Sequence, residues 1–399
     1  MNPSLESLLA DADLCVKCGL CSPHCPTYRQ TADENESPRG RIALIQGWAS
    51  GRLPLTAALR KPLDDCLLCR NCEAVCPAKV PYARLMDRFR AETGQDRKSL
   101  AARALSSAVR EGLRHPLLAN LGRRALDAAA RLPGGSAWKA LPPAGNPEDW
   151  YGEHPAAGEP IAHAGLFLGC TAAVADAATV TAILELLPRL GVSVTVPGNQ
   201  ACCGAMDLHA GDAAAAHALM SRNIEAFAKP PLDAVIGFAS GCSATLLEYR
   251  HHSDTPAAET LSAKVQDVSR FLADRIPPER WDLAPLEAKI LVHTPCSLRN
   301  VCKTESSVDA LLRRIPGAEV KILPDKGRCC GAAGSYMVEH RRMAEAIRAE
   351  TVEAILAESP DYLVTSNIGC ALHLRAGLQG RADIPVVHPV QLLARLQRA

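Results

Sequence analysis

Short apolar runs alternate with amphipathic stretches throughout the second half of the chain. The runs at residues 192–196 and 318–323 are too short for helices and contain β-branched residues, which predicts strands. In residues 180–190, 213–228 and 341–358 the apolar positions recur every three or four residues, which predicts helices. Short strands that alternate with helices are typical of a parallel sheet covered on both faces.

The same order of elements occurs twice between residues 161 and 399. Three landmarks recur at spacings of 126 to 128 residues: 165–170 matches 290–296, the Cys-Cys-Gly triplet at 202–204 matches that at 329–331, and 234–242 matches 362–370. Residues 268–273 and 389–394 also correspond. We therefore expect two α/β repeats whose cysteines follow strand ends, where such sheets place ligands. Two such copies side by side predict a cleft with pseudo-twofold symmetry between them.

The composition is that of a globular protein, except for its cysteines. Of 399 residues, 48% are hydrophobic and 22% are charged, and a formal net charge of +1 gives no drive toward nucleic acid. The N-terminus lacks the basic start and apolar core of a secretory signal, and we find no uncharged apolar stretch long enough to span a membrane. We therefore expect a cytoplasmic protein with no transmembrane segment, whose contact with the inner face of the membrane, if any, is peripheral. In that reducing compartment, seventeen largely clustered cysteines predict metal sites instead of disulfides.

Two C-x2-C-x2-C-x3-C-P motifs lie in the first eighty residues. Their cysteines are Cys15, Cys18, Cys21 and Cys25, then Cys66, Cys69, Cys72 and Cys76. This spacing wraps the backbone around a cubane [4Fe-4S] cluster, and in two-cluster proteins the fourth cysteine ligates the other cluster. We therefore predict one metal cluster on Cys15, Cys18, Cys21 and Cys76, and a second on Cys66, Cys69, Cys72 and Cys25. The alternative is a pair of zinc sites, which usually show two C-x2-C pairs far apart.

Each repeat supplies four further cysteines. They are Cys170, Cys202, Cys203 and Cys242 in the first repeat, and Cys296, Cys329, Cys330 and Cys370 in the second. Adjacent cysteines can bind two iron atoms of one larger cluster, and the glycine after each pair allows close backbone approach. We predict that these eight cysteines bind cofactor, as additional iron–sulfur clusters; the alternative is that they are buried small apolar residues. Cys302 lies outside the repeated pattern and is predicted to be a core residue.

The predicted fold is α+β overall, in four parts. Residues 1–95 form a mainly helical, bacterial-ferredoxin-type domain for two clusters, and residues 96–160 form a helical linker that ends in a Pro/Gly-rich stretch. Residues 161–285 and 286–399 are the two tandem α/β repeats. Within the linker, residues 103–131 carry six arginines among Leu and Ala. This stretch either lies on an anionic membrane surface or packs on the repeats with its arginines in water.

Weaker candidates lie near the cysteines, and none is predicted to be catalytic. Residues 37–41 (Ser-Pro-Arg-Gly-Arg) separate the two ferredoxin motifs, and their arginines hydrogen-bond near a cluster, dock a partner or form a solvated turn. His209, Asn223 and Tyr336 follow the Cys-Cys pairs at helical distances. They either line the cleft, where they would relay protons or contact a quinone, or serve packing and capping.

The paired repeats resemble the CCG (cysteine-rich) domains of heterodisulfide reductase and of glycerol-3-phosphate dehydrogenase. In heterodisulfide reductase each of these domains ends in Cys-x2-Cys, whereas Thr245 and His373 stand at the last position here. In heterodisulfide reductase five cysteines hold a non-cubane cluster; this departure leaves four cysteines in each repeat as the candidate cluster ligands. His373 either replaces a thiol in the second repeat or is a hydrogen-bonding neighbour of its cluster.

The whole layout resembles the iron–sulfur subunit of glycolate dehydrogenase (glycolate oxidase), through residues 25–28, 37–41, 66–76, 329–336 and 367–374. The resemblance implies an electron carrier: FAD-binding glycolate dehydrogenase subunits would oxidise glycolate to glyoxylate, and this chain would pass the electrons toward a quinone or other membrane-associated acceptor. A borrowed flavin agrees with the sequence, because no G-x-G-x-x-G follows a predicted strand. The alternatives are the equivalent subunit of a glycerol-3-phosphate or lactate dehydrogenase, a heterodisulfide reductase-like catalytic subunit, or a metal-stabilised scaffold.

Overall fold

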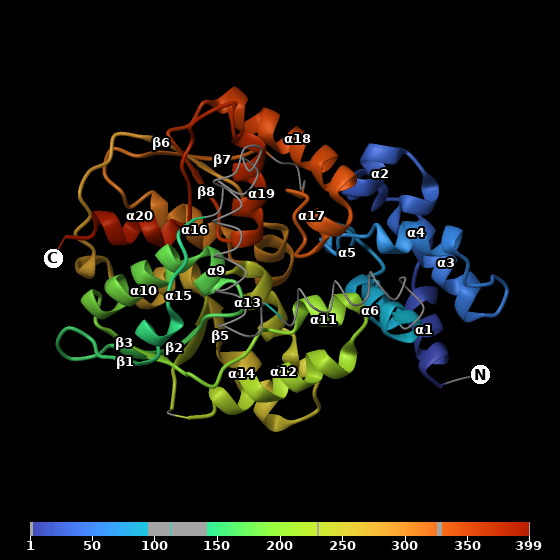
Figure 1. Ribbon diagram of the computed structural model, residues 1–399, viewed down its shortest axis with the longest axis horizontal. Helices are drawn as coiled ribbons and strands as arrows, with labels where there is room; N and C mark the ends of the chain where they lie inside the picture. Colours follow the sequence, from blue (N-terminus) through green and yellow to red (C-terminus); the bar gives the residue numbers. More distant parts are fainter. Residues whose placement is uncertain (1–2, 95–111, 113–141, 230, 325–328, 399) are drawn as a thin grey trace.

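The computed structural model describes residues 3–94, 112, 142–229, 231–324 and 329–398. Figure 1 shows a helical N-terminal domain (blue) beside two repeats that each contain a sheet (green to red). The predicted arginine-rich stretch at residues 103–131 lies outside the described residues, apart from Gly112. Within the described ranges, no helix combines the length and apolar character that crossing a bilayer requires.

The N-terminal domain is built of short helices around one small core, as predicted. The helices are α1 (Pro3–Asp13), α2 (Pro26–Thr31), α3 (Pro38–Ala49), α4 (Ala57–Asp64), α5 (Asn71–Ala74) and α6 (Tyr82–Thr93). Helices α2 and α3 each begin at a proline, Pro26 directly after the first cysteine motif and Pro38 after Ser37; proline suits the first helical turn because no backbone N–H is needed there. Ser37 caps α3 by accepting a hydrogen bond from Gly40 N at 3.0 Å. The cysteine motifs occupy the loops between these helices, so the small core positions both of them.

The first repeat contains a five-stranded sheet. Its strands are β1 (Gly152–His154), β2 (Ala162–Phe167), β3 (Val192–Val196), β4 (Ala234–Gly237) and β5 (Val265–Asp267), in the order β1-β3-β2-β4-β5. Its helices are α9 (Ala172–Ala175), α10 (Ala177–Arg189), α11 (Ala205–Ala210), α12 (Ala213–Ala226), α13 (Ser240–Leu247), α14 (Pro256–Lys264) and α15 (Val268–Arg275). All pairings are parallel except β1 with β3, which is antiparallel. The sequence does not predict β1, which comes from the Pro/Gly-rich stretch and covers the edge of β3.

The second repeat reproduces the four parallel strands. They are β6 (Lys289–Val292), β7 (Glu319–Ile322), β8 (Tyr362–Val364) and β9 (Val386–Val387), in the order β7-β6-β8-β9. The helices are α16 (Glu305–Leu312), α17 (Tyr336–Glu339), α18 (Arg341–Glu358), α19 (Ile368–Leu378) and α20 (Pro389–Leu396), and a π-helical turn covers Leu298–Cys302. The order matches β3-β2-β4-β5 of the first repeat, so the parallel-sheet repeats predicted from the sequence are confirmed.

The two repeats pack against each other through helices and share one apolar core. Helix α10 packs on α20 and α15 on α16, and the buried side chains at this junction include Ile183, Phe271 and Leu393. Backbone pairing extends the contact, because Ser240 N donates to Ser366 O at 3.0 Å. The copies therefore form one body, which holds the carboxyl ends of their strands at fixed positions.

A buried carboxyl group in the first repeat predicts a pH-dependent stability. Asp267 is 1% exposed and caps α15 by accepting from Ser269 N at 2.9 Å, and burial raises its pKa to about 7. The unfolded chain loses this proton near pH 4, so between there and pH 7 only the folded state holds it, and stability falls as pH rises. Asp267→Asn cannot ionise, so it avoids the free-energy cost of a buried charge, while its amide oxygen can still cap α15. Relative to wild type, we expect it to gain about 2 kcal/mol in free energy of unfolding between pH 5.5 and pH 8.

Anaerobic urea unfolding at the two pH values measures this gain. The matched control is Asp254→Asn, because Asp254 is exposed and should leave the pH dependence unchanged. Equal pH dependence in all three proteins would contradict the expectation.

Candidate metal centres

The first ferredoxin motif lines a cavity near the surface of the N-terminal domain. Its cysteines Cys15, Cys18 and Cys21 share this cavity with Cys76 from the second motif, and Cys72 also reaches it. The loop bends sharply at Lys17 (φ 57°) and Gly19 (φ 82°). Left-handed backbone at alternate positions curls the chain and turns its N–H groups inward, which suits a bound anionic cluster. The structure thus brings Cys76 to the first motif.

The second motif repeats this loop conformation deeper in the protein. Leu68 (φ 53°) and Arg70 (φ 61°) stand at the positions of Lys17 and Gly19. Burial raises the pKa of the Cys72 thiol, and the nearby sulfurs of Cys69, Cys66 and Cys25 raise it further. The Cys25 sulfur thus lies near the second motif, as Cys76 lies near the first, and this agrees with the crossed assignment predicted from the spacing.

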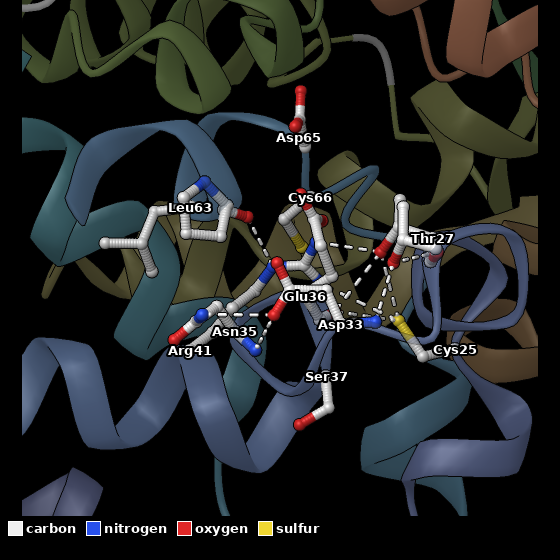
Figure 2. Close-up of polar contacts among 12 residues, drawn as sticks. Cys25, Thr27, Asp33, Asn35, Glu36, Ser37, Arg41, Leu63, Asp65 and Cys66 are labelled. Atoms are coloured by element: carbon white, nitrogen blue, oxygen red, sulfur yellow. Dashed lines mark hydrogen bonds and ion pairs between the residues drawn. The ribbon is translucent and has the colours of Figure 1, made fainter. Parts of the chain in front are cut away.

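Arg41 is buried against the second set of cysteines (Figure 2). It is 1% exposed, and its Nη1 donates to the Cys25 sulfur at 3.5 Å. Its Nη2 donates to Thr27 Oγ1 at 2.8 Å and to Glu36 Oε2 at 2.5 Å, and its Nε donates to Pro62 O. Three roles were considered for the arginines of residues 37–41: hydrogen-bonding near a cluster, docking a partner, or forming a solvated turn. Arg41 hydrogen-bonds to a cysteine sulfur, which matches the first.

Arg39, on the same helix, lies at the other predicted cluster site. It pairs with Glu34 at 2.6 Å and its Nη1 donates to Lys17 O at 3.1 Å, within the first cysteine loop. A Cβ at Gly19 would lie 2.5 Å from Nη1 of this guanidinium, so glycine allows the arginine to lie directly against the loop. The two arginines of α3 therefore lie one at each predicted cluster site: Arg39 at the loop of residues 15–21 and Arg41 at Cys25.

A cavity of about 990 Å³ lies between the N-terminal domain and the two repeats. All eight repeat cysteines line it: Cys170, Cys202, Cys203, Cys242, Cys296, Cys329, Cys330 and Cys370. The N-terminal domain adds Cys66 and Cys69. The predicted cleft is thus present and one of its walls is the ferredoxin-type domain. Thiolates are the donors that iron–sulfur clusters require, so this donor set fits such groups.

Strand ends and helix starts aim the repeat cysteines into the cavity. Cys170 and Cys296 follow β2 and β6, whereas Cys242 and Cys370 lie in the first turn of α13 and α19. Asn367 caps α19 by accepting from Gly369 N at 2.9 Å and from Cys370 N at 3.4 Å. The cap therefore fixes the backbone of the cysteine itself.

The Cys-Cys pair of the first repeat is held by two buried side chains. Asn223 Oδ1 accepts from Ala201 N at 2.7 Å and its Nδ2 donates to Cys202 O at 3.0 Å. Tyr249 OH donates to Cys203 O at 2.9 Å. Asn223 is therefore a clamp on the backbone and, unlike His209 and Tyr336, does not line the cavity.

Neighbouring sulfurs and burial oppose ionisation of one strand-end thiol in each repeat, Cys170 and Cys296. A hydrogen bond with Cys202 and burial hold the pKa of the Cys170 thiol well above its usual range. A hydrogen bond with Cys329 and burial do the same for Cys296. Because the thiolate is the metal ligand, positive charge must enter the site for these sulfurs to become ligands.

The second cysteine set of the N-terminal domain faces the second repeat. Burial raises the pKa of the Cys69 thiol, and the next largest contribution comes from Cys296. Asn300 Nδ2 donates to Cys69 O at 2.7 Å and holds the two segments together. The deeper ferredoxin site and the second repeat are therefore direct neighbours.

Two histidine–aspartate pairs dock the N-terminal domain on the repeats. His209 Nδ1 lies 3.0 Å from Asp87 Oδ1, and His340 Nδ1 lies 2.8 Å from Asp65 Oδ1. Tyr336 stacks on His340 and donates to Asp65 O at 3.0 Å. Each repeat thus contributes the histidine of one pair. His209 and Tyr336, which were predicted near the cleft, line the cavity and also bind the N-terminal domain.

His293, which lies beside the cysteines of the second repeat, was not singled out from the sequence. His373, which was considered, makes its hydrogen bonds elsewhere. The ligand atoms of His293, Cys330 and Cys370 all lie within 4.8 Å of one another. His373 instead contacts Ala344 O through Nε2 at 3.2 Å, and burial lowers its pKa to about 4, so it is a neutral hydrogen-bonding neighbour. The signal for His293 was available in the repeat alignment, where it falls opposite Phe167.

Comparison with known proteins defines the class to which this chain belongs. Residues 11–80 match the 4Fe-4S dicluster domain, and residues 164–247 and 290–375 each match the Cysteine-rich domain. The chain is therefore an iron–sulfur protein with a dicluster domain followed by two cysteine-rich domains, and its cofactors are iron–sulfur clusters.

Full-length relatives narrow this to a family. The chain is 32% identical to the probable glycolate oxidase iron-sulfur subunit of Bacillus subtilis (strain 168), over 95% of its own length and 92% of that protein. It is also 32% identical to the glycolate oxidase iron-sulfur subunit of Escherichia coli (strain K12), over 96% and 95%. Lactate utilization protein A of Geobacillus kaustophilus is 31% identical, over 53% of this chain and 90% of that protein. The chain belongs to the family of glycolate oxidase iron–sulfur subunits.

Proposed function

We propose that this chain carries electrons from an FAD-binding subunit that oxidises glycolate to glyoxylate toward a quinone or another membrane-associated acceptor. The observation that carries the proposal is the cavity lined by cysteines of all three parts of the chain, in which Cys69 neighbours Cys296. A chain that served only as a metal-stabilised scaffold would not need sulfur sites that touch across domain boundaries. The full-length glycolate oxidase relatives support glycolate as the donor.

The proposal assigns ligands to each site. Cys15, Cys18, Cys21 and Cys76 would hold one [4Fe-4S] cluster, and Cys25, Cys66, Cys69 and Cys72 a second. The repeats would hold further clusters through Cys170, Cys202, Cys203 and Cys242, and through Cys296, Cys329, Cys330 and Cys370. When bound, such clusters supply one-electron oxidation and reduction. The protein's residues keep the sites adjacent, exclude water from the deeper ones and set their local charge.

The surface around the first motif fits the place where electrons enter. Cys18 is exposed, and the same loop presents Val16 (69% exposed) and Leu20 (58% exposed). Exposed apolar side chains grouped at one functional loop are typical of a protein-docking surface. Glycolate oxidation releases two electrons and two protons. A flavin docked at this loop would take up both electrons and deliver them singly, and the order of the sites then leads from this loop through Cys69 to the repeats.

Reconstitution tests the proposal. The full chain, purified anaerobically and mixed with the FAD-binding subunit, should restore glycolate-dependent reduction of a quinone analogue. Iron analysis should give about twelve to sixteen irons per chain if the repeats hold clusters, against about eight if they do not. If lactate or glycerol-3-phosphate, and not glycolate, supports the reduction, then the proposed donor is wrong. If none of the three supports it, the whole proposal is overturned.

A further inference from the structure

His293 lies at the carboxyl end of β6, an inner strand of the sheet in the second repeat. It directly follows β6, which is flanked by β7 and β8. The residue is 2% exposed, and its backbone N donates to Val364 O at 2.9 Å, which continues the sheet pairing. Parallel sheets place ligands beyond the carboxyl ends of their strands, so His293 occupies a position suited to binding.

The histidine ring belongs to the cysteine site. A ring nitrogen of His293 and the sulfurs of Cys330 and Cys370 lie within 4.8 Å of one another, and the two sulfurs are 2.9 Å apart. Nδ1 also lies 3.0 Å from Thr365 Oγ1. A hydrogen bond to one ring nitrogen of a metal-ligating histidine orients the ring and fixes its tautomer. Thr365 is placed to do this, because it follows β8 directly at the same sheet edge.

The first repeat has no histidine at the equivalent position. Phe167 stands there, is 1% exposed, and packs its ring 6.2 Å from that of Phe227. The four cysteines match between the repeats, but this one strand-end residue offers a nitrogen donor in one copy and none in the other. The two repeats therefore differ at this position in whether a nitrogen donor lies next to the cysteines.

We propose that His293 is a fifth ligand of the iron–sulfur site in the second repeat, so that the two repeats hold chemically different sites. The first would offer four thiolates, and the second four thiolates and an imidazole. This inference rests on the proposed iron–sulfur role of the repeats. A neutral imidazole leaves the site less negative than a fifth thiolate would, which favours reduction. Because Cys296 of this repeat neighbours Cys69, the histidine-containing site is the first one that electrons meet beyond the ferredoxin-type domain.

Nitrogen couplings test the proposal without reference to activity. The full chain is labelled with 15N-histidine, purified anaerobically and examined by pulsed EPR in its paramagnetic states. We expect a directly bound 15N coupling in the wild type, its loss in His293→Phe and His293→Cys, and its retention in the control His373→Gln. His293→Cys supplies a thiolate of its own, so it should keep the iron content and lower the reduction potential of one site. It also provides the test if His293→Phe does not fold.

Each other outcome counts against the inference in a distinct way. A coupling that persists in His293→Cys, or a wild type with iron-loaded repeats and no coupling, would overturn histidine ligation and leave the proposed electron transfer intact. Zinc in the second repeat would also overturn it. Only about eight irons per chain would remove the role proposed for the repeats, and the inference with it.

Discussion

Replacing Arg41 with leucine is expected to lower the free energy of unfolding by about 3 kcal/mol, because it removes the buried cation of Glu36 and leaves only the exposed Lys61, whose Nζ lies 3.6 Å from Glu36 Oε1. The side chains of Arg41 and Glu36 are almost fully buried, at 1% and 3% exposure. Burial raises the pKa of Glu36 to about 7, against an opposing effect of Arg41. Without the arginine the carboxyl group stays protonated to a higher pH in the folded state than in the unfolded state. The loss of stability should therefore be greater at pH 8 than at pH 6.

The same substitution should also change the redox site. Arg41 brings a positive charge and a hydrogen bond to the Cys25 sulfur. Both features stabilise the more negative, reduced form of a cluster, so the reduction potential of the deeper ferredoxin-type site should fall. We expect a decrease on the order of 60 mV, a tenfold change in a one-electron equilibrium, in an EPR-monitored titration.

Two further variants separate charge from packing at this position. Arg41→Lys keeps the charge but not the planar fork, and should lie between leucine and the wild type in both measurements. The double variant Glu36→Leu/Arg41→Leu removes the uncompensated charge and should recover much of the stability but not the potential. If Arg41→Leu stays within about 1 kcal/mol of the wild type, the ion pair is not the stabilising element that its burial indicates.

Replacing Cys25 with serine is expected to remove about four irons per chain and to reduce electron transfer from the flavin subunit more than about 100-fold. The crossed arrangement makes a specific prediction about which site is lost. Cys25 lies with Cys66, Cys69 and Cys72, so the site lost should be the buried one beside the second repeat. The site at Cys15, Cys18 and Cys21 should remain, and its exposure should make it the site that an iron chelator removes first.

Cys302→Ser is the matched control for this experiment. The Cys302 sulfur contacts Ser240 O at 3.7 Å and lies outside the lining of the large cavity. We expect this variant to keep its iron and its electron transfer, since a serine hydroxyl can keep the contact. Full iron content in Cys25→Ser, or a surviving site that resists the chelator, would contradict the crossed assignment.

Periodicity predicted the elements best where packing and propensity agree. Residues 192–196 and 341–358 form β3 and α18 with the predicted bounds, because the strand has alternating β-branched residues and the helix has long runs of good helix formers. Strand β1 was not predicted because Gly152–His154 has no strand pattern. Its register comes from the open edge of β3, which is a property of the folded sheet and not of those three residues.

The cysteine sets were visible in the sequence because ligand spacing is local. Their neighbours were not, because they come from distant segments. Arg41 reaches Cys25 only after α3 folds back, and nothing in residues 37–41 distinguishes its side chain from that of Arg39, which lies at the surface. Asp65 and His340 are equally unrelated in sequence and meet only in the docked protein.

The wall that the N-terminal domain contributes to the large cavity has a consequence for biosynthesis. Domains fold as units during translation, and the N-terminal one leaves the ribosome first. Its Cys69 loop stays uncovered until the later residues are synthesised. Asn300 then contacts Cys69, and Tyr336 contacts Asp65. Cluster insertion into the ferredoxin-type domain can therefore precede the synthesis of the repeats. The site around Cys370 can be completed only near the end of translation, so maturation has a built-in temporal order.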